Sequence, residues 1–274
     1  MWHRVHSVLR QRVLTAAVLG LILLGVLFLM PPVATVCLVT LLVLVGAWEW
    51  AGFIRKDSTF ARPGFVAIVG ACLVVGWFFV LDSRWLWHVM FIATAWWFVA
   101  FLWIVIAPER VHPVTAALAG LLALVPCWLA LVTIATRWVP GSGWVLFVLA
   151  LVWSADTGAF FAGRYFGKVP LAPRVSPKKT WEGVLGGLLL ATVVAYVGGR
   201  WLGMSGFSFI SLCIAAAAIS VVGDLTESML KRAAGIKDSG SLFPGHGGML
   251  DRIDSVTAAA PVLVLGLNWL VPGT

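Results

Sequence analysis

Residues 207–272 read FSFISLCIAAAAISVVGDLTESMLKRAAGIKDSGSLFPGHGGMLDRIDSVTAAAPVLVLGLNWLVP, in which two apolar runs enclose a short polar segment. Each run approaches the roughly 20 apolar residues that cross a bilayer as a helix. From Asp224 to Asp254 the segment gathers five acidic and four basic residues, although charged residues make up only 11% of the chain. Polar groups concentrated beside membrane-length apolar runs indicate a functional site, in an enzyme or a transporter.

The apolar pattern of this stretch recurs along the whole chain. Hydrophobic residues make up 61% of the 274 residues, and the mean hydropathy is +1.02, which excludes an ordinary soluble domain. We therefore expect an all-α, polytopic integral membrane protein with about nine transmembrane helices. The predicted spans are 13–30, 33–53, 64–81, 85–106, 114–136, 143–163, 183–203, 207–225 and 255–272.

The basic residues predict the orientation of these spans. Sixteen of the 19 Lys and Arg residues fall in the segments on the same side as the N-terminus, and only Arg84, Arg137 and Arg200 fall on the other side. Because basic loops stay in the cytoplasm, we expect a cytoplasmic N-terminus. The net charge of +8 follows mainly from this bias, so we expect membrane lipids and anionic substrates as partners, and no nucleic acid.

The two halves of the chain differ in their acidic residues. Residues 1–140 hold four, of which only Glu49 lies within a predicted span, close to its cytoplasmic end. We interpret Glu49 as a snorkelling or interfacial carboxylate in preference to the alternative, a site residue. We expect this region to be a scaffold of transmembrane helices with room for lipid or dimer contacts, and 141–274 to be a transmembrane catalytic region. A transporter built from inverted repeats would place polar interruptions in both halves, which this chain does not.

The first polar loop of the second half begins in the span that contains Asp156. A carboxylate at that depth needs a cation, a metal ion or hydrogen-bond donors, so Asp156 is either part of a site or the structural partner of Arg164. Further on, Ser176-Pro177-Lys178-Lys179-Thr180 precedes the span 183–203. Ser176 or Thr180 can cap that helix, and the two lysines at its start suit a polyphosphate, although a basic cytoplasmic flank would look the same. In the span itself, Gly183, Gly186 and Gly187 allow another helix to approach closely.

The second polar loop carries carboxylates in two pairs. Asp224 and Glu227 are spaced i,i+3, as are Asp251 and Asp254. Oxygen ligands that converge from two helix ends are what a divalent cation needs, and magnesium is favoured over zinc because His246 is the single imidazole nearby.

Glycines and basic residues lie between the two carboxylate pairs. The turn that ends in His246-Gly247-Gly248 offers backbone amides to phosphate oxygens. The basic residues around it are Lys231, Arg232, Lys237 and Arg252. Carboxylates, clustered cations and glycine turns together are typical of phosphoryl or nucleotidyl transfer.

These residues closely resemble the signature of the phosphatidate cytidylyltransferases, also called CDP-diacylglycerol synthases. The signature positions here are Ser228, Lys231, Arg232, Lys237, Asp238, His246, Gly247, Gly248, Asp251, Arg252 and Asp254. The upstream loop also resembles the bacterial members, through Asp156-Thr157-Gly158-Ala159, Gly163-Arg164 and Ser176–Thr180.

The resemblance implies that CTP and phosphatidate react to give CDP-diacylglycerol and pyrophosphate during phospholipid biosynthesis. It implies Mg²⁺ as cofactor, with K⁺ allowed beside it, a homodimer, and an active site on the cytoplasmic face of the bacterial inner membrane. The catalytic residues it implies are Asp224, Asp251, Asp254, Lys231, Arg232 and His246, and the first three of these would bind the metal. The substrate-binding residues would be Asp156, Arg164, Ser176, Lys178, Lys179, Thr180, Ser228, Lys237, Asp238, Gly247, Gly248 and Arg252.

Two alternatives remain at the level of sequence. One is a related enzyme that uses an ether-lipid phosphate or a polyprenol with CTP. The full signature disfavours a polyprenol kinase, but acyl and ether tails leave no mark on these motifs. The other is a cation or phosphate transporter, which would need ionisable groups through the outer half of the membrane. After residue 140 the outer loops offer only Arg200.

Overall fold

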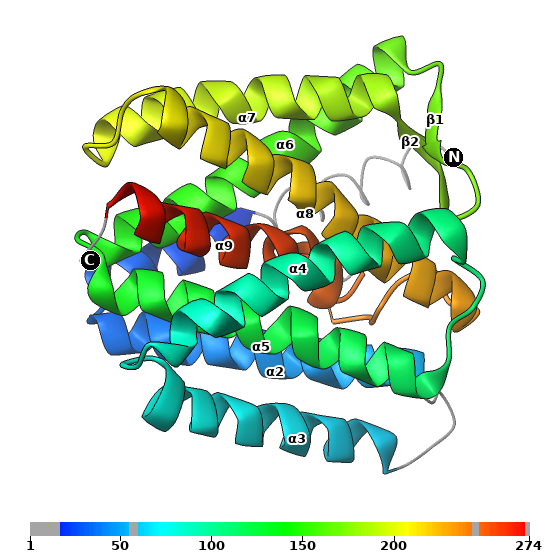
Figure 1. The fold of residues 1–274 in the computed structure, drawn as a ribbon, viewed down its shortest axis with the longest axis horizontal. Helices are drawn as coiled ribbons and strands as arrows, with labels where there is room; N and C mark the ends of the chain where they lie inside the picture. The colour runs from blue at the N-terminus through cyan, green and yellow to red at the C-terminus, as the bar shows by residue number, and fades with distance from the viewer. Residues whose placement is uncertain (1–16, 55–59, 243–246, 272–274) are drawn as a thin grey trace.

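The computed structural model describes residues 17–54, 60–242 and 247–271, and nearly all of these residues lie in helices. Eight of the helices described are long and apolar enough to cross a membrane. In chain order the elements are α2 (Pro32–Ile54), α3 (Ala61–Val75) with a π-helical continuation η1 (Gly76–Val80), α4 (Trp85–Ile106), α5 (Pro113–Arg137), α6 (Gly141–Phe166), β1 (Pro170–Ala172), β2 (Ser176–Thr180), α7 (Trp181–Trp201), α8 (Phe207–Ala233) and α9 (Leu250–Leu270) (Figure 1).

This architecture confirms the expected all-α, polytopic membrane protein. The first predicted span, 13–30, overlaps a shorter apolar helix at Ala17–Leu29, and residues 13–16 lie outside the described ranges. The count of nine spans therefore stays a prediction. The small exception to the helical pattern is an antiparallel hairpin of β1 and β2 in the first polar loop.

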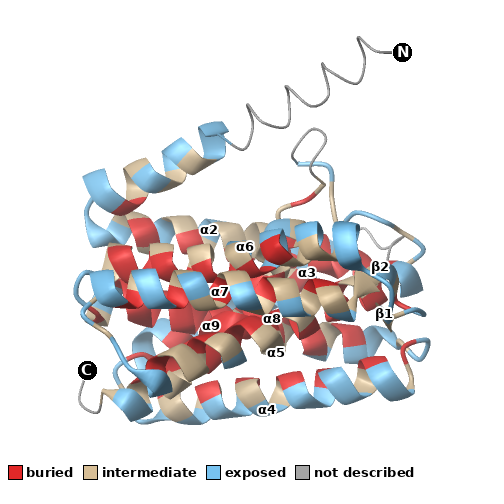
Figure 2. Cartoon of the chain, turned by 90° about the horizontal axis from the view of Figure 1, so that it is seen from above, coloured by how far each residue is buried: buried red, intermediate tan, exposed pale blue. Residues whose placement is uncertain are grey.

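Of the membrane-length helices, α5 and α9 are the most buried. The helices α3 and α7 lie at opposite edges of the bundle in Figure 1, and α4 lies at an edge in Figure 2. The α5 residues are mostly buried, whereas α4 exposes large apolar side chains such as Phe91 and Ile106. Lipid tails are the natural surroundings of such a surface, because apolar side chains of this size would be costly in water. We therefore look for the polar groups of the bundle in its interior and at its ends.

Glycines set the close packing of α6 on α7. A Cβ atom on Gly158 would lie 2.5 Å from the backbone oxygen of Gly186 and 3.0 Å from Cα of Gly187. Only a residue without a side chain permits this approach, so the sequence-based prediction that Gly186 and Gly187 bring two helices together is confirmed. The contact fixes the turn of α6 that carries Asp156 against the first turns of α7.

The polar segment after 225 is more helical than the sequence suggested. α8 continues to Ala233 and α9 begins at Leu250, so the predicted spans 207–225 and 255–272 end too early and start too late. The reason is local neutralisation: Glu227 and Lys231 form an ion pair at i,i+4, which lets a charged segment stay helical while it packs against α9. The site residues on α8 thus stand on a rigid element.

Candidate active site

The site is built where α8 and α9 lie side by side (Figure 1). A Cβ atom on Gly223 would lie 2.6 Å from the backbone oxygen of Asp254, so the two helices touch at this point through backbone. The carboxylates next to the contact are Asp224 on α8 and Asp254 on α9. The absence of a side chain at Gly223 therefore brings the two predicted carboxylate pairs to the same depth.

Lys231 links the two pairs. Its Nζ atom lies 2.9 Å from Oε2 of Glu227 and 2.6 Å from Oδ1 of Asp251. The Glu227 and Lys231 residues are buried, with 1% and 9% of their surface exposed. A buried ion pair is costly to break from one side, because the remaining partner keeps an uncompensated charge. Lys231 is therefore fixed in place with its charge satisfied by two carboxylates from different helices.

Asp251 holds the loop between the helices. Its Oδ2 atom accepts hydrogen bonds from the backbone amides of Ser239, at 3.1 Å, and Gly248, at 2.8 Å, and the Ser239 hydroxyl lies at 3.0 Å. With Lys231 on Oδ1, both oxygens of this carboxylate are engaged. Gly247 adopts φ +79°, and a Cβ atom there would come within 2.5 Å of Asp251 Oδ2. The turn therefore closes on Asp251 only with glycine at this position.

Three carboxylates, those of Asp224, Glu227 and Asp254, form an acidic group around the α8–α9 contact. Asp224 accepts a hydrogen bond from the Ser228 hydroxyl at 3.3 Å and forms an ion pair with Lys179 of β2. Asp254 lies within electrostatic range of both Asp224 and Glu227. No hydrogen-bond donor among the described residues reaches Oε1 of Glu227, although this atom is buried. The group holds more negative than positive charge, so a further cation would stabilise it.

Asp156 joins this group from α6. Its Oδ1 atom lies 3.5 Å from the Ser255 hydroxyl of α9, and Asp224, Lys179 and Arg252 are within electrostatic range. Within the part of the chain that the structure describes, no ion pair joins Asp156 to Arg164, which lies exposed near the end of α6. The interpretation of Asp156 as part of the site therefore fits the structure better than a structural pair with Arg164.

The β1–β2 hairpin places Lys179 beside the acidic group. Thr180 caps α7 by accepting a hydrogen bond from the amide of Gly183 at 3.2 Å, so Thr180 and not Ser176 is the cap that the sequence left open. Side chains alternate along a strand, and accordingly Lys178 is exposed while Lys179 pairs with Asp224. Ser176 lies at the start of the same strand.

Arg232 faces away from Lys231, its neighbour in the sequence. It lines a separate pocket of about 220 Å³ with Arg174 of the hairpin turn and Glu109 of the α4–α5 connection. Val175 and Met229, which also line the pocket, are apolar and buried. Asp224 and Arg232 are eight residues apart on α8, or about 12 Å along the helix. The structure therefore shows a pocket with three charged lining residues, separate from the acidic group, and places a predicted catalytic residue in it.

Other predicted residues lie at the edges of the site. Lys237 and Asp238 are exposed in the segment that leads from α8 to Ser239, and Arg252 is exposed in the first turn of α9. Gly248 is buried next to Asp251. His246 lies outside the described residues.

Metal ligation was expected from Asp224, Asp251 and Asp254 together. Among the described residues, no three Asp, Glu, His or Cys side chains stand as a ready set of metal ligands. Asp251 is the member that is already occupied, by Lys231, Ser239 and Gly248. The oxygens of Asp224, Glu227 and Asp254 are nevertheless of the type that Mg²⁺ prefers, and the unpartnered Glu227 oxygen lies among them. By donor chemistry, this acidic group fits a hard divalent cation.

Glu49 of α2 is buried beside the loop between α8 and α9, so the structure does not fit its interpretation as an interfacial carboxylate. It is 7% exposed, and its carboxylate accepts hydrogen bonds from the Ser239 hydroxyl at 2.8 Å and from the amides of Met249 and Leu250 at 3.0 and 2.8 Å. An interfacial carboxylate would instead reach water. Its one signal in the sequence was its place as the only acidic residue within a span of the first 140 residues. Its partners lie about 200 residues away, so no local pattern could name them.

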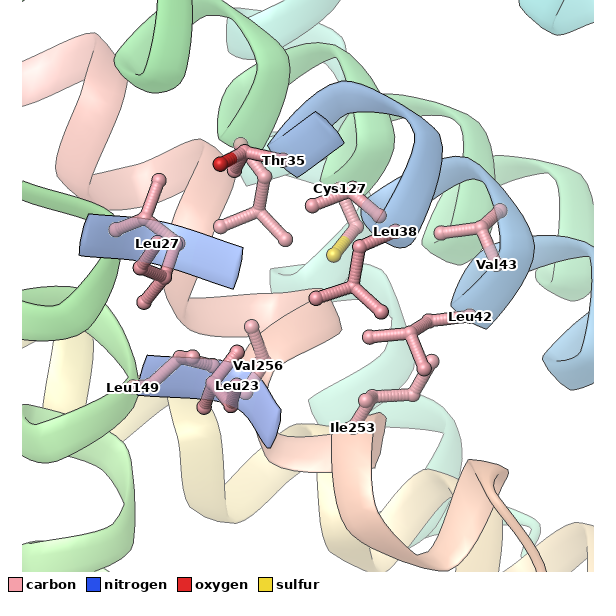
Figure 3. A pocket seen from close by; sticks show the side chains of 13 residues that line it. Leu23, Leu27, Thr35, Leu38, Leu42, Val43, Cys127, Leu149, Ile253 and Val256 are labelled. Atoms are coloured by element: carbon pink, nitrogen blue, oxygen red, sulfur yellow. The ribbon is translucent and has the colours of Figure 1, made fainter. Parts of the chain in front are cut away.

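A second cavity lies in the apolar interior, away from the charged residues. It measures about 40 Å³ and lies among side chains of helix Ala17–Leu29, α2, α5, α6 and α9, including Leu23, Leu38 and Ile253 (Figure 3). A volume of this size leaves no room for a nucleotide or a phosphate, and its lining supplies no charge to hold one. The chemistry therefore belongs to the polar end of the bundle.

Comparison with known proteins shows the family of the chain. A phosphatidate cytidylyltransferase of Pseudomonas aeruginosa is 41% identical over 281 residues, which cover 96% of this chain and 100% of that protein. One of Haemophilus influenzae is 39% identical over 92% of this chain and 96% of its own length. A chloroplastic one of Arabidopsis thaliana is 46% identical over 43% of this chain and 31% of its own. The model of the cytidylyltransferase family matches residues 10–270, and the chain thus belongs to that family.

Proposed function

We propose that this protein is a phosphatidate cytidylyltransferase, which converts CTP and phosphatidate into CDP-diacylglycerol and pyrophosphate. The observation that carries the proposal is the meeting of Lys179, Asp224 and Asp254 from the hairpin, α8 and α9 at one end of a membrane-embedded bundle. Two relatives similar over nearly the whole chain carry that name. The basic residues gathered at this end support a cytoplasmic active site in a bacterial inner membrane.

The chain's own residues support a reaction by direct transfer. A phosphate oxygen of phosphatidate attacks the α-phosphorus of CTP, the bond from this phosphorus to the bridging oxygen breaks, and pyrophosphate leaves with the bonding electrons. Lys179 and Lys231 neutralise part of the negative charge of the carboxylates beside them. The lipid tails stay in the bilayer. Because both substrates arrive with a phosphate in place, positioning and charge neutralisation account for the rate without a covalent intermediate.

A divalent cation belongs in this proposal as the partner of the acidic group. Asp224, Glu227 and Asp254 would hold it, and Asp251 would position Lys231 in place of ligating the metal. When bound, Mg²⁺ supplies charge neutralisation at phosphate oxygens. K⁺ beside it and a homodimer remain predictions.

Transfer of label tests the function directly. Purified wild-type protein with α-labelled CTP, phosphatidate and Mg²⁺ is expected to place label in the lipid fraction and to release unlabelled pyrophosphate. Parallel reactions with an ether-lipid phosphate and with a polyprenol distinguish the related enzymes. Absence of labelled lipid from phosphatidate, in correctly folded protein with Mg²⁺ and K⁺ varied, would refute the proposal and redirect attention to ion or phosphate transport.

Asp254→Asn tests the metal proposal. We expect a fall in label transfer of about 100-fold, together with a higher Mg²⁺ concentration for half-maximal activity, because one charged oxygen ligand is lost. Binding of Mn²⁺ followed by electron paramagnetic resonance should weaken in parallel. An unchanged Mg²⁺ requirement and unchanged Mn²⁺ binding would exclude Asp254 as a ligand.

Arg174→Ala and Arg232→Ala test whether the 220 Å³ pocket binds a substrate phosphate. Each loss of a charge-assisted hydrogen bond should lower kcat/KM by about 10- to 100-fold, through a raised KM for the substrate whose phosphate enters the pocket. Arg200→Ala, at the last turn of α7, is the matched control. Unchanged KM values for both CTP and phosphatidate would remove this pocket from the substrate site.

A further inference from the structure

The first turn of α9 carries site residues but has no cap of its own. Its N-cap residue, Met249, makes no side-chain capping hydrogen bond. The free amides of a helix start need acceptors, and a carboxylate there also interacts favourably with the helix dipole. The Glu49 side chain supplies both, by accepting from Met249 and Leu250 at 3.0 and 2.8 Å. A residue of α2 thus caps the helix that presents Asp251 and Asp254.

The same carboxylate reaches Asp251 through one side chain. The Ser239 hydroxyl lies 2.8 Å from Glu49 Oε2 and 3.0 Å from Asp251 Oδ2, so it can donate to either. Asp251 in turn contacts Lys231, which contacts Glu227. A continuous series of polar contacts therefore runs from α2 to the buried end of the acidic group on α8.

Backbone packing shows that the space around Glu49 is tightly shaped. A Cβ atom on Gly248 would lie 2.5 Å from Glu49 Oε1, and one on Gly240 would lie 2.8 Å from its carboxyl carbon. Both glycines belong to the segment that joins α8 to α9, and each approaches the carboxylate with its backbone. Glu49 therefore contacts both described parts of this segment, the part with Gly240 and the part with Gly248.

We infer that Glu49 is a positioning residue for cytidylyl transfer, acting through Ser239 and the start of α9 on Asp251 and Lys231. This inference rests on the proposed function for its kinetic consequence and assigns an active-site role to the N-terminal half of the chain. Glu49 sets where the Lys231 ammonium stands and leaves the binding of the lipid phosphate to other groups.

The test compares the kinetics of Glu49→Gln, Ser239→Ala and the variant that carries both changes, with Asp82→Asn as the control. Glutamine keeps the size of the side chain but turns an NH₂ group toward N–H donors. We expect kcat to fall about 10- to 100-fold with KM for phosphatidate unchanged, and the double variant to be no slower than Glu49→Gln alone, because both changes break one series of contacts. Asp82 pairs with Arg137 on an exposed loop, and its change should leave kcat unaltered.

Hydrogen exchange supplies a readout that needs no turnover. Peptides covering 247–251 should exchange faster in Glu49→Gln, with the rest of the bundle unchanged. Unchanged exchange there would overturn the inference even if the wild type proved inactive on phosphatidate. A wild-type kcat in Glu49→Gln would also overturn the inference, as would a loss of activity that only matches the loss of folded protein. So would a double variant in which the fall in kcat is the product of the falls in the two single variants.

Discussion

Asp251→Asn is expected to reduce label transfer from CTP into lipid by at least about 100-fold. The carboxylate receives Lys231 on one oxygen and the amides of Ser239 and Gly248 on the other. Asparagine has nearly the same shape, but its NH₂ group must face either the ammonium or the amides, where a donor would meet a donor. Breaking a buried charge pair from one side costs about 3–5 kcal/mol. If this whole cost appears in the transition state, it corresponds to a rate loss of roughly 10²- to 5 × 10³-fold.

The control for this variant is Asp82→Asn, which removes an ion pair of similar type from a side chain that is 93% exposed. An exposed pair contributes little, so this change should leave both activity and stability near wild type. Retention of more than about half of the wild-type activity by Asp251→Asn would show that the Lys231 contact is dispensable.

Gly248→Ala is expected to abolish activity without changing any charge. The added Cβ atom would lie 2.5 Å from Glu49 Oε1, closer than packed atoms tolerate, and the Ser239 hydroxyl is also in its way. Relief requires the Glu49 carboxylate or the start of α9 to move, and either movement breaks the hydrogen bonds that hold Asp251 in place. We expect activity below about 1% of wild type and a lower unfolding temperature, since overpacking of this kind costs about 1–3 kcal/mol.

The matched control is Gly64→Ala, because a Cβ atom at Gly64 has no neighbour within 4 Å. That variant should be fully active, and slightly more stable because alanine favours the helix. Combining Gly248→Ala with Glu49→Gln should add little further loss, since both act on the same contact. Normal activity in Gly248→Ala would mean that this segment takes another arrangement during catalysis.

Spans and motifs are the features that local sequence determined. A run of about 20 apolar residues can satisfy its backbone in a bilayer only as a helix, so composition alone predicts the helices. The prediction of close helix packing at Gly186 and Gly187 is also local. A residue without a side chain leaves space for a neighbouring helix, whichever helix that is. The clustering of Asp224, Lys231 and Asp251 likewise indicated a site, since charge beside membrane spans is rare without a function.

The division of roles among the clustered residues depended on tertiary structure. Sequence spacing treated Asp251 as a metal ligand like Asp254, but the fold surrounds Asp251 with donors and leaves a Glu227 oxygen without one. Lys231 and Arg232 are neighbours in sequence, yet one helical step of about 100° separates their directions. Lys231 pairs with Glu227 and Asp251, whereas Arg232 lines the pocket that Arg174 also lines.

Glu49 shows most clearly what the sequence by itself could not supply. Its residue type and its place in an apolar span were visible, and both were compatible with an interfacial carboxylate. Its role follows from hydrogen bonds to Ser239, Met249 and Leu250, which only the packing of α2 beside α9 brings within reach. The sequence by itself determined which segments are long and apolar enough to cross the membrane and where the charge gathers. The tertiary structure decided which charges meet, because contacts across about 200 residues leave no periodic trace in the chain.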